Sequence, residues 1–121
     1  MKIKGFATPA GTQNYKARFE NQFASDYFKQ KNGLWFSSLG IGSYLGNPDE
    51  ATDQAYEAAL KEAVLSGINV IDSAINYRAQ RSERSFGRAL ADLFQTAALK
   101  REEVILCTKG GFLPFDNSYP P

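Results

Sequence analysis

The chain has 121 residues, 43% of them hydrophobic, which is enough for one domain of ordinary size with an apolar core. Its net charge of +1, from 14 basic and 13 acidic residues, gives no electrostatic reason to expect binding to nucleic acid or to an anionic membrane. The single cysteine excludes an internal disulfide framework and fits a reducing compartment. We find neither a membrane-spanning run nor a hydrophobic signal core, so a cytoplasmic protein is expected.

Residues 1–26 are predicted to form an N-terminal extension to a domain that covers residues 27–121. The segment TPAG reads as a turn, and NYKARFENQF predicts a short helix with three aromatic residues on one face: Tyr15, Phe19 and Phe23. The dipeptide Asn32–Gly33 then predicts a β-hairpin with arms at 27–31 and 34–37, because a type I′ turn needs positive φ at both central residues.

Beyond the hairpin, short apolar runs alternate with amphipathic helical patterns. The runs predict strands at 36–42, 68–72 and 104–109. One helix is expected at about 49–66, and a second should begin near Ser82, a plausible N-cap. The second helix carries apolar residues at helical spacing: Phe86, Ala89, Leu90, Leu93 and Phe94. Strands that alternate with helices form a parallel sheet through right-handed crossovers, so we predict an α/β fold with both helices on one face.

Polar residues mark the carboxyl ends of the second and third strands, where α/β folds bind ligands. Asp72 ends the second strand, Lys109 ends the third, and Tyr77 lies in the loop above Asp72. Side chains alternate along a strand, so Asp72 shares a face with Val70, and Lys109 shares one with Cys107. If these faces coincide, the carboxylate and the ammonium should lie within roughly 4 Å, with the Tyr77 hydroxyl close to the same ammonium.

These three residue types have a chemical use together. A free tyrosine has a pKa of about 10 and is a reluctant acid at neutral pH. A nearby ammonium stabilises its phenolate and makes it a better proton donor, while a carboxylate keeps the ammonium charged and in position. Such a set could protonate a carbonyl oxygen as hydride reaches the carbonyl carbon, with Asp72 orienting Lys109 and Tyr77 donating the proton.

Simpler roles for the same residues stay open. A lysine after a strand is usually solvated, a loop tyrosine usually packs, and an aspartate after a strand often caps the next segment. Cys107 is expected to be a small buried residue and not a nucleophile, because the sequence has no histidine to activate it. Four arginines are expected to form a solvated face, with an anion contact by one of them as the alternative: Arg78, Arg81, Arg84 and Arg88.

Three glycines after the first strand, Gly40, Gly42 and Gly46, resemble a dinucleotide-binding fingerprint. That motif places its last glycine at the start of a helix, whose N-terminus binds the pyrophosphate. Here Asn47 and Pro48 intervene, and the acidic residues that follow would repel the phosphate. We therefore set this alternative aside.

Four segments, in this order and spacing, resemble the N-terminal third of the aldo/keto reductases: SSLGIGSYLG, GINVIDSAINY, RSERSFGRAL and VILCTKGG. The resemblance covers about residues 27–112. It implies a (β/α)8 TIM barrel with an N-terminal hairpin across its floor, and the reduction of aldehydes or ketones with NADPH. It further implies that Tyr77 is the proton donor, that Lys109 makes this phenol more acidic and that Asp72 pairs with Lys109. The cofactor contacts that it implies are Gly42, Ser43, Tyr44 and Asp72.

Two features depart from the family pattern. The segment RAQR replaces a glycine-containing turn after the tyrosine, which changes the expected shape of the substrate pocket. The family's catalytic histidine lies on a fourth strand, whereas this sequence has no histidine and about half the roughly 250 residues of a typical barrel. We therefore expect an N-terminal fragment of an NADPH-dependent reductase of small carbonyl compounds, without a metal site. The alternative is a non-catalytic remnant that serves as a binding or interaction module.

Overall fold

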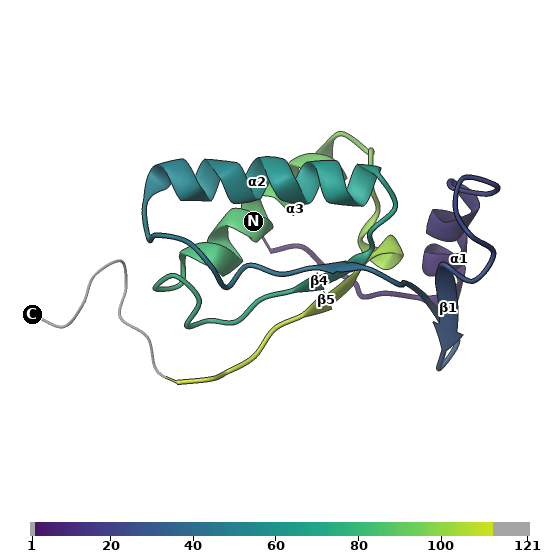
Figure 1. The fold of residues 1–121 in the computed structure, drawn as a ribbon, viewed down its shortest axis with the longest axis horizontal. Helices are drawn as coiled ribbons and strands as arrows, with labels where there is room; N and C mark the ends of the chain where they lie inside the picture. Colours follow the sequence, from purple (N-terminus) through teal and green to yellow (C-terminus); the bar gives the residue numbers. More distant parts are fainter. Residues whose placement is uncertain (1, 113–121) are drawn as a thin grey trace, which may run out of the picture.

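The structure is a computed structural model, and it describes residues 2–112. A small parallel sheet has two helices on one of its faces, and a hairpin and a short helix lie at one end (Figure 1). The strands lie in the order β3 (Gly40–Ile41), β4 (Val70–Asp72) and β5 (Ile105–Cys107). The covering helices are α2 (Glu50–Leu65) and α3 (Arg81–Gln95). The predicted parallel order and the placement of both helices on one face are confirmed, although each strand is shorter than predicted.

The hairpin forms where the sequence predicts it. Strands β1 (Phe28–Lys31) and β2 (Leu34–Ser37) pair antiparallel around Asn32 and Gly33. Their φ values of 53° and 80° are both positive, as a type I′ turn requires. A glycine removes the steric cost of this conformation at the second turn position.

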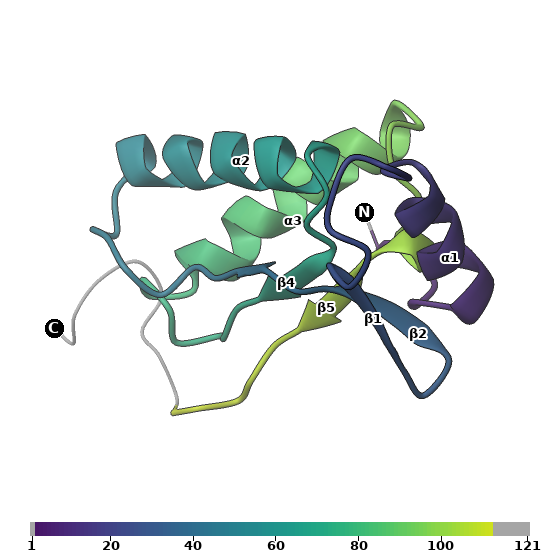
Figure 2. The ribbon, with the colours of Figure 1, turned by 45° about the vertical axis from the view of Figure 1, so that its right-hand side comes forward.

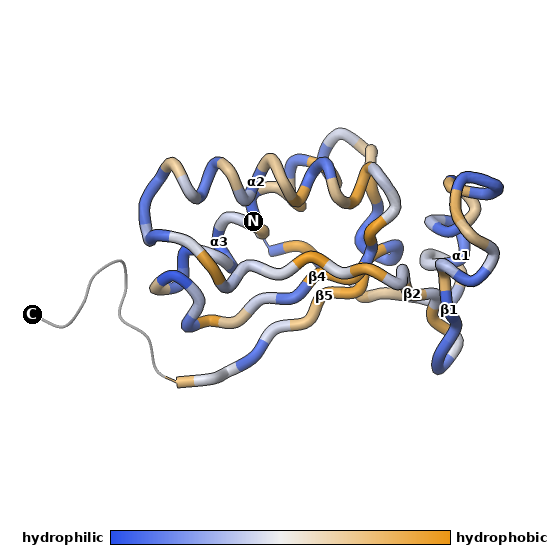
Figure 3. Tube along the Cα trace, in the orientation of Figure 1, coloured by the Kyte–Doolittle hydropathy of each residue, from blue (hydrophilic) through white to orange (hydrophobic). Residues whose placement is uncertain are grey.

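The core lies between the helices and the sheet. Both helices are amphipathic, and Figure 3 shows hydrophilic and hydrophobic residues alternating along α2. Ile71 on β4 is 2% exposed, and its neighbours in the core include Leu60 and Val64 of α2. From α3 the predicted apolar positions are buried, except that Phe94 is partly buried: Phe86, Ala89, Leu90 and Leu93. The apolar spacing of the sequence therefore identifies the buried faces correctly.

Side chains cap the start of α2 and attach the hairpin to the sheet. Asp49 is the N-cap of α2, and its Oδ1 accepts a 2.8 Å hydrogen bond from the Thr52 backbone. This interaction with Thr52 holds the pKa of Asp49 below its usual range.

The buried Asn69, just before β4, accepts a hydrogen bond from the Ser37 backbone and donates one to the Trp35 carbonyl. The hairpin is thus fixed to the sheet by an amide side chain.

The N-terminal segment differs from the prediction. The segment TPAG is the start of a helix, α1 (Pro9–Ala17), and is not an isolated turn. Thr8 is its N-cap, and Pro9 occupies the first turn, where a missing N–H costs nothing. The helix also ends before Phe19, so the predicted helix over residues 14–23 is wrong in its bounds. A turn and a helix N-terminus have similar residue preferences, which explains the error.

The predicted aromatic face nevertheless forms. The Tyr15 and Phe19 ring centroids are 5.2 Å apart, and those of Phe19 and Phe23 are 5.8 Å apart. Tyr15 is fully buried, and its hydroxyl donates a 2.6 Å hydrogen bond to the Val64 carbonyl at the end of α2. Burial raises the pKa of Tyr15 well above its ordinary value. The aromatic side chains therefore pack the N-terminal extension against the end of α2.

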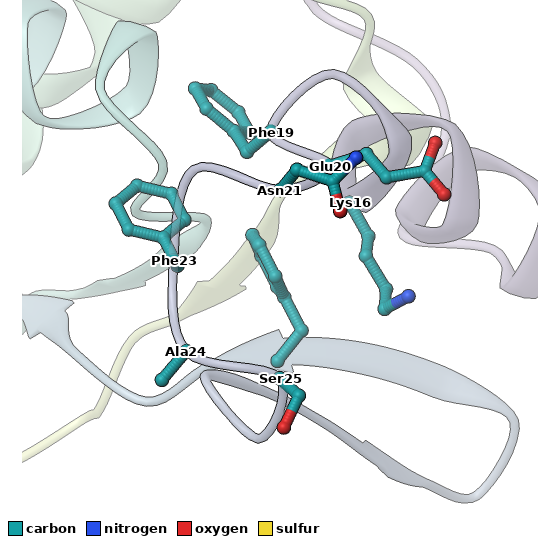
Figure 4. A pocket seen from close by; sticks show the side chains of 8 residues that line it. Lys16, Phe19, Glu20, Asn21, Phe23, Ala24 and Ser25 are labelled. Atoms are coloured by element: carbon teal, nitrogen blue, oxygen red, sulfur yellow. The ribbon is translucent and has the colours of Figure 1, made fainter.

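A hollow of about 280 Å³ opens beside these aromatic residues (Figure 4). Its walls come from the extension and the start of β1: Lys16, Phe19, Glu20, Asn21, Phe23, Ala24, Ser25 and Phe28. Among residues 2–112, no helix is both long enough and apolar enough to cross a membrane.

Candidate active site

The carboxyl ends of β4 and β5 bring Asp72 and Lys109 together. The Lys109 Nζ lies 2.8 Å from each carboxylate oxygen of Asp72 and donates a 2.9 Å hydrogen bond to the Ser73 carbonyl. The two side chains project from the same face of the sheet, as strand parity predicts. The predicted separation of less than about 4 Å is confirmed.

Tyr77 lies over the same ammonium. The Lys109 Nζ is 5.0 Å from the centre of the Tyr77 ring, within the range of a cation–π contact. The hydrogen bond to Asp72 raises the pKa of Lys109, partial burial opposes this, and the nearby Tyr77 phenol raises it further. The ammonium therefore stays protonated well above neutral pH beside both an acceptor and a phenol.

A cavity of about 310 Å³ adjoins this group. Residues from the ends of β3 and β4 and from α2 form its walls: Gly42, Ser43, Tyr44, Leu45, Tyr56, Asp72 and Tyr77. Five of these were predicted from the sequence. Leu45 was not, although it lies within the motif after β3, because an apolar loop residue carries no chemical signal; Tyr56 was not, because it lies on α2, away from the strand ends. The Tyr44 ring is 66% exposed and meets the Tyr77 ring edge-on, with centroids 5.1 Å apart.

The glycine and the serine of this wall have different roles in the structure. A Cβ on Gly42 would have nothing within 4 Å, so this position leaves open space for a flat group to approach the backbone. Ser43 is fully buried, and its hydroxyl donates a 2.8 Å hydrogen bond to the Ser73 hydroxyl. The Ser43 carbonyl accepts a 2.6 Å hydrogen bond from Ser82.

A model of the aldo/keto reductase family matches residues 38–120. The chain belongs to the aldo/keto reductase family. The matched range includes Asp72, Tyr77 and Lys109, together with every strand of the parallel sheet. A comparison with solved structures finds no match for the chain.

The arginines of this family member do not all lie on a solvated face, so that prediction is wrong. Arg78 has a side chain that is only 1% exposed, and its Nη2 lies 2.6 Å from the Asp53 carboxylate. Arg81 binds the other oxygen of Asp53 at 2.7 Å. Arg84 and Arg88 are exposed, as predicted. Asp53, which pairs with the buried Arg78, lies 25 positions earlier in the chain at the start of α2. The residues next to Arg78 in the sequence therefore did not indicate this ion pair.

The charge state of Asp53 follows from this pairing. Burial raises the pKa of this carboxyl, but hydrogen bonds and charges from Arg81 and Arg78 outweigh the burial and leave the pKa below its usual range. An ionised Asp53 therefore compensates the buried guanidinium of Arg78.

Two further predictions around the site are wrong. Ser82 does not cap α3, because the N-cap is Gln80, and the Ser82 hydroxyl bonds to Ser43 across the fold. Cys107 is exposed and not buried. It pairs in register with Asp72 and therefore lies on the sheet face away from the helices. Among residues 2–112, no group of three or more acidic or cysteine side chains could hold a metal ion.

Proposed function

We propose that the chain takes part in the NADPH-dependent reduction of small aldehydes or ketones to alcohols. We further propose that it is the N-terminal part of a (β/α)8 barrel enzyme. The observation that carries this is the meeting of Asp72, Lys109 and Tyr77 at the carboxyl ends of adjacent parallel strands. Ligands of parallel α/β folds bind at this end of the sheet.

The three residues divide the proton chemistry among them. The Tyr77 hydroxyl gives its proton to the carbonyl oxygen of the substrate and becomes a phenolate. The Lys109 ammonium stabilises that phenolate, and Asp72 keeps the ammonium charged and oriented through its two 2.8 Å contacts. NADPH, if held against Gly42, Ser43, Tyr44 and Asp72, would supply the hydride for the carbonyl carbon, and the product would be an alcohol. Tyr77 then regains a proton from solvent.

The lining of the cavity beside Tyr77 supports the binding of one end of such a cofactor. Its wall contains the four residues to which the family resemblance assigns cofactor contact: Gly42, Ser43, Tyr44 and Asp72. Gly42 leaves the backbone approachable, and Tyr44 presents an exposed ring on which a flat heterocycle could stack. The buried Ser43 hydroxyl is already bonded to Ser73, so we expect Ser43 to contribute through its backbone.

An interaction module is the second candidate, and one observation favours it. Large apolar side chains are exposed near the outer strands of the sheet: Leu39 is 60% exposed and Leu106 is 40% exposed. Strands β3 and β5 each pair on one side among the described residues, which leaves backbone groups available for pairing. Such edges are suited to association with another chain.

Residue-resolved NMR of the 15N-labelled chain during titration with NADPH tests the proposal. Shifts should concentrate at the cavity wall, around Gly42, Tyr44 and Tyr77, and NADH should bind more weakly. Tyr44→Ala should weaken NADPH binding about 3- to 10-fold, which corresponds to the value of one aromatic stack. Phe6→Ala, which removes an aromatic residue that is 73% exposed elsewhere, is the matched control and should leave binding unchanged. Absent or scattered shifts would reject the reductase proposal in favour of the interaction module.

A further inference from the structure

The turn after Tyr77 has an unusual backbone. Arg78, Ala79 and Gln80 have φ values of 50°, 52° and 71°, so three successive residues adopt the left-handed conformation. For residues other than glycine this conformation costs about 1 kcal/mol or more each. Strain of this kind persists only where the surrounding structure holds it. This turn lies directly after Tyr77, the proposed proton donor, and neighbouring segments must hold it.

The guanidinium of Arg78 supplies the restraint. Its Nε donates a 2.9 Å hydrogen bond to the Asn47 carbonyl, and its Nη2 bonds to the Asp49 carbonyl at 3.2 Å and to the Asp53 carboxylate at 2.6 Å. The Arg78 guanidinium carbon also lies 5.0 Å from the centre of the Tyr56 ring. All these partners belong to the loop after β3 or to α2. The side chain therefore ties the turn after β4 to the segment after β3.

These contacts lead back to Tyr77 through the cavity wall. The Tyr56 hydroxyl donates a 2.5 Å hydrogen bond to the Leu45 carbonyl, and Leu45 follows Tyr44. The Tyr44 ring then meets the Tyr77 ring edge-on. In Figures 1 and 2 the loops after β3 and β4 lie at the same end of the sheet. Arg78 thus links Tyr77 to the opposite wall of its own cavity.

The stability of the fold alone does not require this arrangement. A buried charge carries a desolvation cost, and an apolar residue of similar volume is often equally stable or better. Within residues 2–112, the buried Nη1 of Arg78 has no hydrogen-bond partner, which adds to that cost. A buried, paired arginine does restrict geometry, because its planar fork fixes several acceptors at once.

We propose that Arg78 is a positioning residue for Tyr77. Its guanidinium holds the left-handed turn and the Tyr44 segment in one arrangement, and this sets the phenol over Lys109 at the edge of the cavity. The inference builds on the proposed reductase function, in which Tyr77 donates the proton. It assigns a role to the segment RAQR, which stands where the family usually has a glycine-containing turn.

The test compares ring contacts in labelled wild-type and variant chains of 121 residues. Nuclear Overhauser contacts of the Tyr77 ring with Tyr44 and with Lys109 report its position, and thermal unfolding reports stability. In Arg78→Lys, which keeps the charge but loses the fork, both contacts should be lost in the folded protein while the Asp72–Lys109 pair persists. Arg88→Gln is the matched control, because Arg88 is half exposed and also reaches α2, where it pairs with Glu57 at 2.7 Å and approaches Asp53 only to 3.9 Å. It should keep all the contacts.

A purely structural role would lower the unfolding temperature of Arg78→Lys and leave the Tyr77 contacts intact, and that result would overturn the proposal. Equal loss of contacts in Arg88→Gln would also overturn it. If Arg78→Lys does not fold, Asp53→Asn is the second variant, because it keeps the hydrogen bonds of Arg78 to both backbone carbonyls. The contacts of the Tyr77 ring should still weaken in Asp53→Asn. Intact Tyr77 contacts in this variant would then refute the positioning role of Arg78. None of these readouts uses NADPH. A chain that fails to bind NADPH but shows the Arg78 dependence therefore rejects the reductase function alone.

Discussion

Gly11 is a sensitive point of the interface between the N-terminal extension and the rest of the protein. It lies in the first turn of α1, against the short 3₁₀ helix η1 (Arg101–Glu103). A Cβ at position 11 would lie 2.3 Å from the Glu102 carbonyl oxygen and 2.6 Å from the Glu102 carbonyl carbon. Since ordinary contacts are about 3.5 Å, Gly11→Ala has to move α1 away from η1 by roughly 1 Å.

Two opposing effects decide the size of the change. Alanine is favoured over glycine inside a helix by about 1 kcal/mol, and by less in a first turn. Overpacking against a rigid backbone costs about 1–3 kcal/mol, and the displacement also weakens the 3.1 Å hydrogen bond from the Thr8 backbone to the Glu102 carbonyl. The steric cost exceeds the gain in helix propensity, so we expect Gly11→Ala to lower the free energy of unfolding by about 1–3 kcal/mol. For a chain of this size, the unfolding temperature should fall by roughly 4 °C per kcal/mol.

Thermal and urea unfolding, followed by circular dichroism, measure this change. Gly87→Ala is the matched control, because Gly87 is also helical but a Cβ there would have nothing within 4 Å. It should raise the unfolding temperature slightly through helix propensity alone. If Gly11→Ala is as stable as the wild type, α1 does not pack against η1 in solution, and the reasoning is refuted.

Three further outcomes are expected. First, the 121-residue chain should not reduce aldehydes, because it has no histidine to complete the site. Incubation with NADPH and a panel of aldehydes should show no loss of reduced-nicotinamide absorbance above a buffer control. Turnover that Tyr77→Phe abolishes would contradict this. Asp72→Asn should lower the NMR titration midpoint of Lys109, because the hydrogen bond to Asp72 is the main cause of its raised pKa; an unchanged midpoint would mean that the pair is absent in solution. The pKa of Asp53 lies below its usual range, so the stability that its ionised form contributes is present above about pH 4 and is lost as the pH falls through the lower folded-state value. Urea unfolding should therefore show a steeper loss of stability below about pH 4 for the wild type than for Asp53→Asn, and parallel curves would argue against the ion pair.

Local patterns in the sequence were sufficient for much of the fold and for the central pair of the site. The turn at Asn32–Gly33 forms because the conformation of two adjacent residues decides it. The buried face of α3 follows from helical spacing. The meeting of Asp72 and Lys109 follows from strand parity and a parallel order of neighbouring strands. Each of these depends on a few residues that are close in sequence or on a simple repeat.

Tertiary structure decided the environment of the remaining residues. The sequence predicts a surface position for Arg78, but its guanidinium pairs with Asp53, 25 positions earlier in the chain. Ser82 looked like a helix cap, but its hydroxyl bonds to Ser43, 39 positions earlier. Gly11 gave no signal in the sequence, although the backbone of Glu102 packs directly against it. In each case a partner far along the chain sets the energy of the residue, and only the folded path of the backbone brings that partner within reach.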